Sequence, residues 1–153
     1  ASYAIDPERD TQEIVVLAAD AEQAAKIRDR LAWTGIDEFG GYVTTLAPFD
    51  RQPIEILSPA ELERAQNVQV LDVRTASEHA AGTVDGAMQL HAGRLRWKLD
   101  ELPKGVTLVA HCQTGGRSAV AASILRRHGD WKVAELAGSY EGWKAHQEAA
   151  TAA

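Results

Sequence analysis

One cysteine lies in a segment whose neighbours could make it reactive. Cys112 follows a short apolar stretch, residues 106–110, and precedes an alanine-rich stretch, residues 119–127. We predict a strand before the cysteine, a helix after it, and a tight turn at Gly115-Gly116 between them. A thiol in such a turn faces the N-terminus of the following helix, which stabilises an anion. Because the thiolate is the nucleophilic form of cysteine, the segment indicates a catalytic or sulfur-carrying site.

The residues that follow the cysteine are expected to bind whatever reacts with it. The backbone N–H groups of the turn should converge on the thiol and stabilise negative charge there. Arg117 closes the turn, and two roles stay open for it: it holds an anionic donor, or it pairs with a carboxylate such as Glu78. We assign catalysis to Cys112, and substrate binding to Gln113, Thr114, Gly115, Gly116, Arg117 and Ser118.

Three polar residues further upstream are expected to support the turn rather than to touch substrate. Asp72 and Arg74 lie at the end of a short apolar stretch, where they would fix loops, and Glu78 follows them closely. His111 precedes the cysteine, but neighbouring residues of a strand point to opposite faces. We therefore expect His111 in the interior and not in a Cys–His dyad.

The composition limits the classes of function. The chain has 153 residues, of which 45% are hydrophobic and 25% are charged, as in soluble globular proteins. A net charge of −6 argues against nucleic-acid binding. The sequence has no apolar run of about 20 residues that would cross a membrane. A single cysteine excludes an intrachain disulfide and favours a reducing, cytoplasmic location. The histidines lack metal-ligand spacing with this cysteine, so we expect no metal and no cofactor.

Residues 59–146 alternate between predicted strands and helices. Ser58 is a suitable N-cap, and Pro59 suits the first position of a helix. The alternation predicts an α/β fold with a mainly parallel central sheet and helices on both faces. The expected strands are residues 70–73, 87–90, 106–110 and 132–136, and the later helices are residues 94–101, 119–127 and 140–150.

The beginning of the chain is similar to the segment around the cysteine. Residues 14–20 align with residues 106–112, and residues 31–35 align with residues 125–129. Asp20 stands at the place of the cysteine. A chance match between two strand–helix–strand units is the alternative explanation. We predict a partial, degenerate, cysteine-less copy at residues 1–50 and a complete domain at residues 51–153, with its active loop at residues 112–117.

Four motifs, in order and with suitable spacing, make the chain from about residue 54 to residue 150 resemble the rhodanese family of sulfurtransferases. Three positions depart from the usual residues of these motifs: Thr83 replaces histidine, Asp85 replaces proline, and Ser139 replaces a second glycine. The motifs are residues 70–74 with Glu78, residues 82–87, residues 112–118 and residues 136–143.

The resemblance implies a rhodanese-like fold, a rhodanese domain at residues 51–153 and a degenerate rhodanese-like segment at residues 1–50. It implies that Cys112 carries sulfane sulfur as a persulfide and passes it to a thiol or to cyanide. Four residues separate Cys112 from Arg117. The related dual-specificity phosphatases have five, so the shorter loop favours sulfur transfer over phosphatase activity. Gln113 replaces the basic residue of many rhodaneses, which favours an organic persulfide or polysulfide donor over thiosulfate.

A second resemblance concerns the whole chain. A degenerate copy, a linker and a competent copy are similar to the C-terminal part of proteins that join a metallo-β-lactamase-like hydrolase to tandem rhodanese domains. We therefore expect this chain to be part of a longer protein with an N-terminal hydrolase domain. The expected partners are a small sulfur donor and a thiol acceptor, and a homodimer stays open. The alternative function is a non-catalytic docking or regulatory module of the larger hydrolase.

Overall fold

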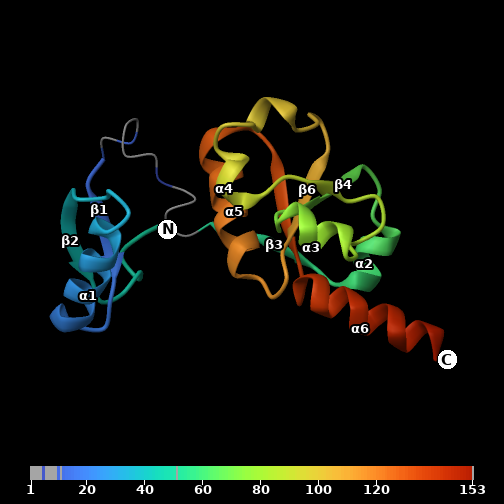
Figure 1. Cartoon of the computed structure of the whole chain (residues 1–153), viewed down its shortest axis with the longest axis horizontal. Helices are drawn as coiled ribbons and strands as arrows, with labels where there is room; N and C mark the ends of the chain where they lie inside the picture. Colours follow the sequence, from blue (N-terminus) through green and yellow to red (C-terminus); the bar gives the residue numbers. More distant parts are fainter. Residues whose placement is uncertain (1–4, 6–9, 11, 51, 153) are drawn as a thin grey trace. The chain divides into compact units, whose positions relative to one another are not determined.

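The computed structural model describes residues 5, 10, 12–50 and 52–152. The chain forms two compact units, Ala1–Pro53 and Ile54–Ala153 (Figure 1). No helix among the described residues has both the length and the apolar character needed to cross a bilayer.

The first unit is a strand–helix–strand arrangement. Its strands β1 (Ile14–Leu17) and β2 (Phe39–Val43) pair in parallel, and helix α1 (Ala21–Ala32) connects them. Asp20, which the sequence aligns with the cysteine, is the N-cap of α1, and its side chain accepts a hydrogen bond of 2.8 Å from Gln23 N–H. At this position the carboxylate therefore has a structural role that aspartate often fills.

The second unit contains a sheet of five parallel strands in the order β3-β7-β6-β4-β5. Helices lie between successive strands, which confirms the predicted α/β class. Strand β6 lies at the centre of the sheet. The elements are β3 (Glu55–Leu57), α2 (Pro59–Arg64), β4 (Val68–Asp72), α3 (Ala76–Ala80), β5 (Met88–Gln89), α4 (Ala92–Leu95), η1 (Leu99–Glu101), β6 (Thr107–His111), α5 (Gly116–His128), β7 (Lys132–Leu136) and α6 (Ser139–Thr151).

One face of this sheet packs against α2 and α6. Val109 of β6 pairs with Val70 of β4 and with Ala134 of β7, and these residues form a buried cluster with Leu62 of α2. Trp143 of α6 packs on the same cluster. Burying one leucine completely stabilises the fold by about 1.5–3 kcal/mol, so this cluster holds β6 firmly in place.

The opposite face packs against α5. Leu108 and Ala110 alternate with Val109 along β6, and both are fully buried. Helix α5 contacts β6 and β7 and buries Ile124 and Leu125. The central strand is therefore covered on both faces, which explains its continuous apolar sequence.

Two local expectations differ from the structure. The helix expected over residues 94–101 is divided into α4 and η1, because successive i→i+3 hydrogen bonds, such as Lys98 N–H to Leu95 O, replace helical ones. Strand β3 was not expected. It is an edge strand of three residues, and Ile56 is 65% exposed, so its sequence carries little apolar pattern.

Candidate active site

Cys112 lies at the carboxyl end of β6, directly before the turn that begins α5. Its side chain is 2% exposed. Gly115 adopts φ = +115°, a conformation that L side chains rarely adopt, and this allows the chain to turn back over the thiol. As a result the Gly115 N–H donates a hydrogen bond of 3.1 Å to the Cys112 Sγ atom. The predicted contact between the thiol and a main-chain amide of the turn is therefore present at Gly115.

The surroundings of the sulfur favour its anionic form. Burial raises the pKa of the Cys112 thiol, because a charge loses its hydration there. Hydrogen bonds from several backbone N–H groups oppose this effect and lower the pKa below its ordinary value. The donors are the amides of Ser118, Gly115, Thr114 and Arg117.

Arg117 pairs with Glu78, one of the two roles that the sequence left open for it. Its Nη1 and Nη2 atoms donate hydrogen bonds of 2.8 Å and 2.6 Å to the two carboxylate oxygens. Glu78 is itself positioned at the start of α3 by a capping box with Thr75. The Arg117 guanidinium and the Thr75 N–H together lower the pKa of Glu78 well below its usual range. The loop arginine is therefore anchored to α3.

Asp72 and Arg74 form a buried ion pair behind the loop. Asp72 is 0% exposed and Arg74 is 2% exposed, and their shortest contact, Nη2 to Oδ2, is 2.7 Å. The Asp72 carboxylate also accepts a 2.8 Å hydrogen bond from Thr83 Oγ1. Burial raises the pKa of Asp72, but the bonds from Arg74 and Thr83 and the nearby His111 outweigh it and lower the pKa well below its usual range.

The Arg74 guanidinium connects three separate segments to the loop. Its Nη1 atom donates to Gln113 Oε1 at 3.1 Å, and its Nη2 atom donates to the Gly82 carbonyl at 2.6 Å. It also lies over the Tyr140 ring, 4.1 Å from the ring centre. These contacts fit the supporting role that the sequence assigned to Arg74.

The start of α6 holds the backbone of the cysteine, a contact that no local sequence pattern predicts. The Tyr140 N–H donates to the Cys112 carbonyl at 3.0 Å, and the Glu141 N–H donates to the Gln113 carbonyl at 3.3 Å. The Cys112 N–H in turn donates to Ser139 Oγ at 3.3 Å. Ser139 has φ = +54°, a backbone conformation in which glycine would be less strained than serine.

His111 lies in the interior, as expected. It is 0% exposed, and its Nδ1 atom lies 3.2 Å from the Cys112 carbonyl oxygen, where an Nδ1–H donates. Its Nε2 atom lies 3.8 Å from Asp72 Oδ2 and makes no hydrogen bond. Burial lowers the pKa of His111. The ring therefore contacts the backbone of the cysteine and not its thiol.

The remaining predicted site residues lie along the loop. Ser118 is buried, and its hydroxyl contacts both the Gly115 carbonyl at 2.8 Å and Glu135 Oε2 at 2.9 Å. Thr114 and Gly116 are exposed. Among the described residues, no group of three or more histidine, cysteine, aspartate or glutamate side chains is placed to hold a metal ion.

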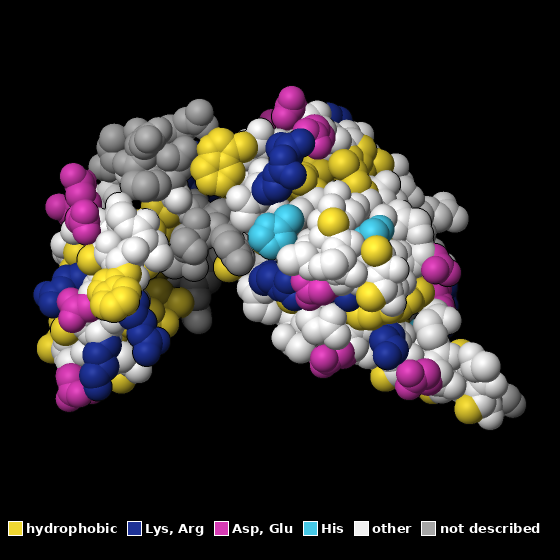
Figure 2. Space-filling view, in the orientation of Figure 1, with side chains coloured by type: hydrophobic (Ala, Val, Ile, Leu, Met, Phe, Trp, Pro, Cys, Tyr) yellow, Lys and Arg dark blue, Asp and Glu magenta, His cyan; other side chains and the backbone are white. Residues whose placement is uncertain are grey.

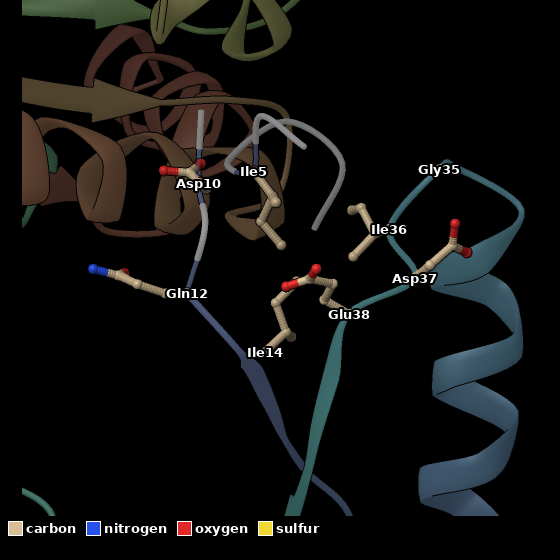
Figure 3. Close-up of a pocket in the computed structure, with 8 residues that line it drawn as sticks. All are labelled: Ile5, Asp10, Gln12, Ile14, Gly35, Ile36, Asp37 and Glu38. Carbon is tan, nitrogen blue, oxygen red and sulfur yellow. The ribbon is translucent and has the colours of Figure 1, made fainter. Parts of the chain in front are cut away.

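A hollow of about 310 Å³ in the first unit is a separate feature (Figure 3). The side chains of Ile5, Ile14 and Ile36 point toward one another there, and the Glu38 carboxylate lies between them. The described lining includes no cysteine, serine, histidine or lysine. It therefore offers no nucleophile for the chemistry indicated by the Cys112 loop.

Known proteins are similar to the second unit in sequence. The model of the rhodanese-like domain family matches residues 58–146. A sulfurtransferase of Allochromatium vinosum is 32% identical over 85 residues, which are 56% of this chain and 79% of that protein. The thiosulfate sulfurtransferase GlpE of Coxiella burnetii is 27% identical over 93 residues, which are 61% of this chain and 87% of that protein.

Solved structures show the same fold. A rhodanese-related protein of Thermoplasma volcanium aligns with a TM-score of 0.56 and 26% identity, over 60% of this chain and 92% of that chain. A Rhodopseudomonas palustris protein described as a possible tyrosine phosphatase aligns with a TM-score of 0.54 and 25% identity, over 61% and 82% of the two chains. The family match covers more than half of the sequence and includes the whole Cys112 loop. This chain therefore belongs to the rhodanese-like domain family.

Proposed function

We propose that the second unit is a sulfurtransferase that carries sulfane sulfur as a persulfide on Cys112. The observation that supports this most directly is the Gly115 N–H on the Cys112 sulfur, in a loop whose amides lower the pKa of the thiol. A lowered pKa increases the fraction of thiolate, which is the form that attacks, and the same amides would stabilise a persulfide anion. The relatives named as sulfurtransferases support the same reaction class.

The reaction proceeds in two half-reactions. In the first, the Cys112 thiolate attacks the outer sulfur of a donor, an S–S bond forms, and the donor's own S–S bond breaks. Thiosulfate would leave as sulfite, and an organic persulfide would leave as its thiolate. In the second, an acceptor thiolate or cyanide attacks the outer sulfur, and the electron pair of the broken bond returns to Cys112. This is a ping-pong scheme with a covalent intermediate.

Phosphatase activity is the competing chemistry for this fold, and the loop argues against it. Only four residues separate Cys112 from Arg117. The Arg117 guanidinium, which a phosphatase would need for the phosphate oxygens, has both terminal nitrogens bound to Glu78. We therefore expect no turnover of aryl phosphates that depends on Cys112.

The setting of the reaction belongs to the same proposal. We infer a reducing, cytoplasmic environment, because a lone thiol stays usable there. We also propose that this chain belongs to a longer protein with an N-terminal metallo-β-lactamase-like hydrolase domain. A homodimer is the proposed assembly. The second candidate function is a docking or regulatory module that keeps the loop without turnover.

The test is the mass of the intact protein after exposure to inorganic polysulfide. We expect the wild-type protein to gain the mass of one sulfur atom and to lose it on addition of cyanide, with thiocyanate formed. Cys112→Ser should gain nothing, because it removes the single cysteine of the chain. The matched control is Ser123→Ala, which alters an exposed residue of α5 and should load as the wild type does.

Two outcomes would contradict the proposal. A Cys112 thiol that reacts with iodoacetamide but never gains sulfur would favour the docking module. Sulfur gained equally by Cys112→Ser would place the chemistry elsewhere.

A further inference from the structure

An exposed carboxylate contacts the residue that directly follows Cys112. Glu141 is exposed and belongs to the first turn of α6. Its carboxylate Oε1 accepts a hydrogen bond from Gln113 Nε2 at 3.3 Å, and its N–H binds the Gln113 carbonyl. Gln113 directly follows the nucleophile. Both contacts fix the Glu141 charge beside the loop.

The two arginines that contact the loop residues or belong to the loop are already paired with carboxylates. Arg117 is bound by Glu78 through both terminal nitrogens, and Arg74 is bound by Asp72. Within the described part of the chain, Glu141 makes no ion pair, and its only side-chain partner is the neutral Gln113.

Among these five charged side chains, the balance is therefore negative. Arg74 pairs with Asp72 and Arg117 pairs with Glu78, so these four charges cancel. Glu141 adds one negative charge that is unpaired among the described residues. On the face drawn in Figure 2, basic and acidic side chains are interspersed over the unit that contains the loop, and no extended basic patch covers it. A negative balance of this kind attracts cations and repels anions over short distances.

We propose that Glu141 is a specificity-determining residue that selects thiols with a positively charged amine as acceptors of the Cys112 sulfur. The inference rests on the proposed sulfurtransferase function and names the acceptor class. A small aminothiol carries its ammonium group a few bonds from its sulfur, so the ammonium can approach Glu141 while the sulfur reaches the persulfide. A carboxylate in place of the ammonium would be repelled.

The transfer step is balanced without a further reactant. The acceptor thiolate attacks the outer sulfur of the Cys112 persulfide, and a new S–S bond forms on the acceptor. The S–S bond to Cys112 breaks, its electron pair returns to Cys112 as the thiolate, and the outer sulfur leaves on the acceptor as a persulfide anion. Glu141 takes no part in bond making and acts only through charge.

The test compares three acceptors of similar size and different charge: cysteamine, 2-mercaptoethanol and 3-mercaptopropionate. The full chain is loaded with one sulfur, freed from the donor and mixed with each thiol, and the loss of the added mass is followed with time. The variant is Glu141→Gln, which keeps the hydrogen bond to Gln113 and removes the charge. Its matched control is Glu148→Gln, the same change at an exposed position near the far end of α6.

Rates relative to 2-mercaptoethanol cancel any general effect of the variant on loading or stability. One charge interaction at about 4 Å in water-like surroundings corresponds to about 1 kcal/mol, or roughly fivefold. We expect Glu141→Gln to lower the relative rate of cysteamine roughly fivefold and to raise that of 3-mercaptopropionate by a similar factor. Glu141→Lys should reverse the order of the two, and Glu148→Gln should match the wild type.

The outcomes separate this inference from the function on which it rests. Equal relative rates in wild type, Glu141→Gln and Glu141→Lys would overturn the role of Glu141 while leaving sulfur transfer intact. A wild-type persulfide that none of the three thiols removes would instead overturn the proposed acceptor chemistry, and the selection with it.

Discussion

The buried pair of Asp72 and Arg74 determines how the loop is supported. Removing two charges from water costs more than their attraction returns unless further hydrogen bonds are made. Here Asp72 accepts a further hydrogen bond from Thr83, and Arg74 donates further hydrogen bonds to Gln113 and to the Gly82 carbonyl. The pair therefore contributes mainly by fixing the relative positions of β4, the segment that follows α3, and the loop.

This arrangement predicts a large cost for breaking the pair. Asp72→Asn leaves the Arg74 charge buried without its counter-ion, which typically costs about 3–5 kcal/mol. The free energy of unfolding from urea titration should fall by that amount. The control is Glu101→Gln, which breaks the partly exposed ion pair with Lys98 and should cost less than about 1 kcal/mol. Equal losses in the two variants would contradict the structural role of Asp72.

At Ser139, a strained backbone conformation is offset by a hydrogen bond that the side chain accepts. Its φ of +54° is costly for a residue with a side chain, whereas glycine would adopt it freely. In return its hydroxyl accepts the Cys112 N–H, a buried donor that is costly to leave unpaired. The departure from the family's glycine therefore has a local physical reason.

The turn between β6 and α5 is the element on which the reactivity of the thiol depends. Gly115→Ala places a side chain at φ = +115°, so we expect a loss of about 1–2 kcal/mol in stability and a displaced loop. The amides would then point less well at the sulfur, and the pKa of Cys112 should rise toward its ordinary value. The measurement is the rate of iodoacetamide alkylation as a function of pH.

A second glycine provides the comparison for this experiment. Gly105 also has a positive φ, +75°, and a Cβ added there meets no other atom within 4 Å. Gly105→Ala should therefore lose comparable stability without changing the alkylation profile of Cys112. A shift of the profile in both variants, or in neither, would show that the loop amides do not control the thiol.

The elements that the sequence predicted well are those whose signal is local. The apolar strand, the glycine turn and the helix around Cys112 are contiguous, so pattern and turn chemistry suffice to place them. The contacts of Tyr140 and Glu141 with the loop join residues nearly thirty positions apart, and no local pattern encodes them. Strand β3 was missed because an edge strand of three residues depends on its partner β7 rather than on its own sequence.

At the scale of the whole molecule, the two units share one arrangement. The parallel pair β1–β2 joined by α1 follows the same order as β6, α5 and β7. The second unit covers Val109 with α2 and α6, whereas Leu17, its aligned position in the first unit, is 52% exposed. That the first unit is a degenerate copy stays a prediction, and it would account for the Asp20 cap at the place of the cysteine.

The stability of the second unit should depend on pH in two stages. Burial lowers the pKa of His111, so below about pH 6.5 the unfolded chain binds a proton that the folded chain does not. Asp72 and Glu78 have lowered pKa values in the folded state, so below about pH 4 the unfolded chain again binds more protons. Both differences reduce the free energy of unfolding as the pH falls.

Urea unfolding at a series of pH values, followed by tryptophan fluorescence, measures the stability of the second unit in each stage. Trp33 of the first unit is 92% exposed, so its signal changes little on unfolding, and Trp131 of the second unit is 8% exposed and reports on that unit. We expect stability to be highest above about pH 7 and to decline first through the histidine range. His111→Asn should flatten the curve between about pH 7 and 5, because the first stage depends on that ring losing its proton when buried. An unchanged slope in His111→Asn would assign the first stage to another group.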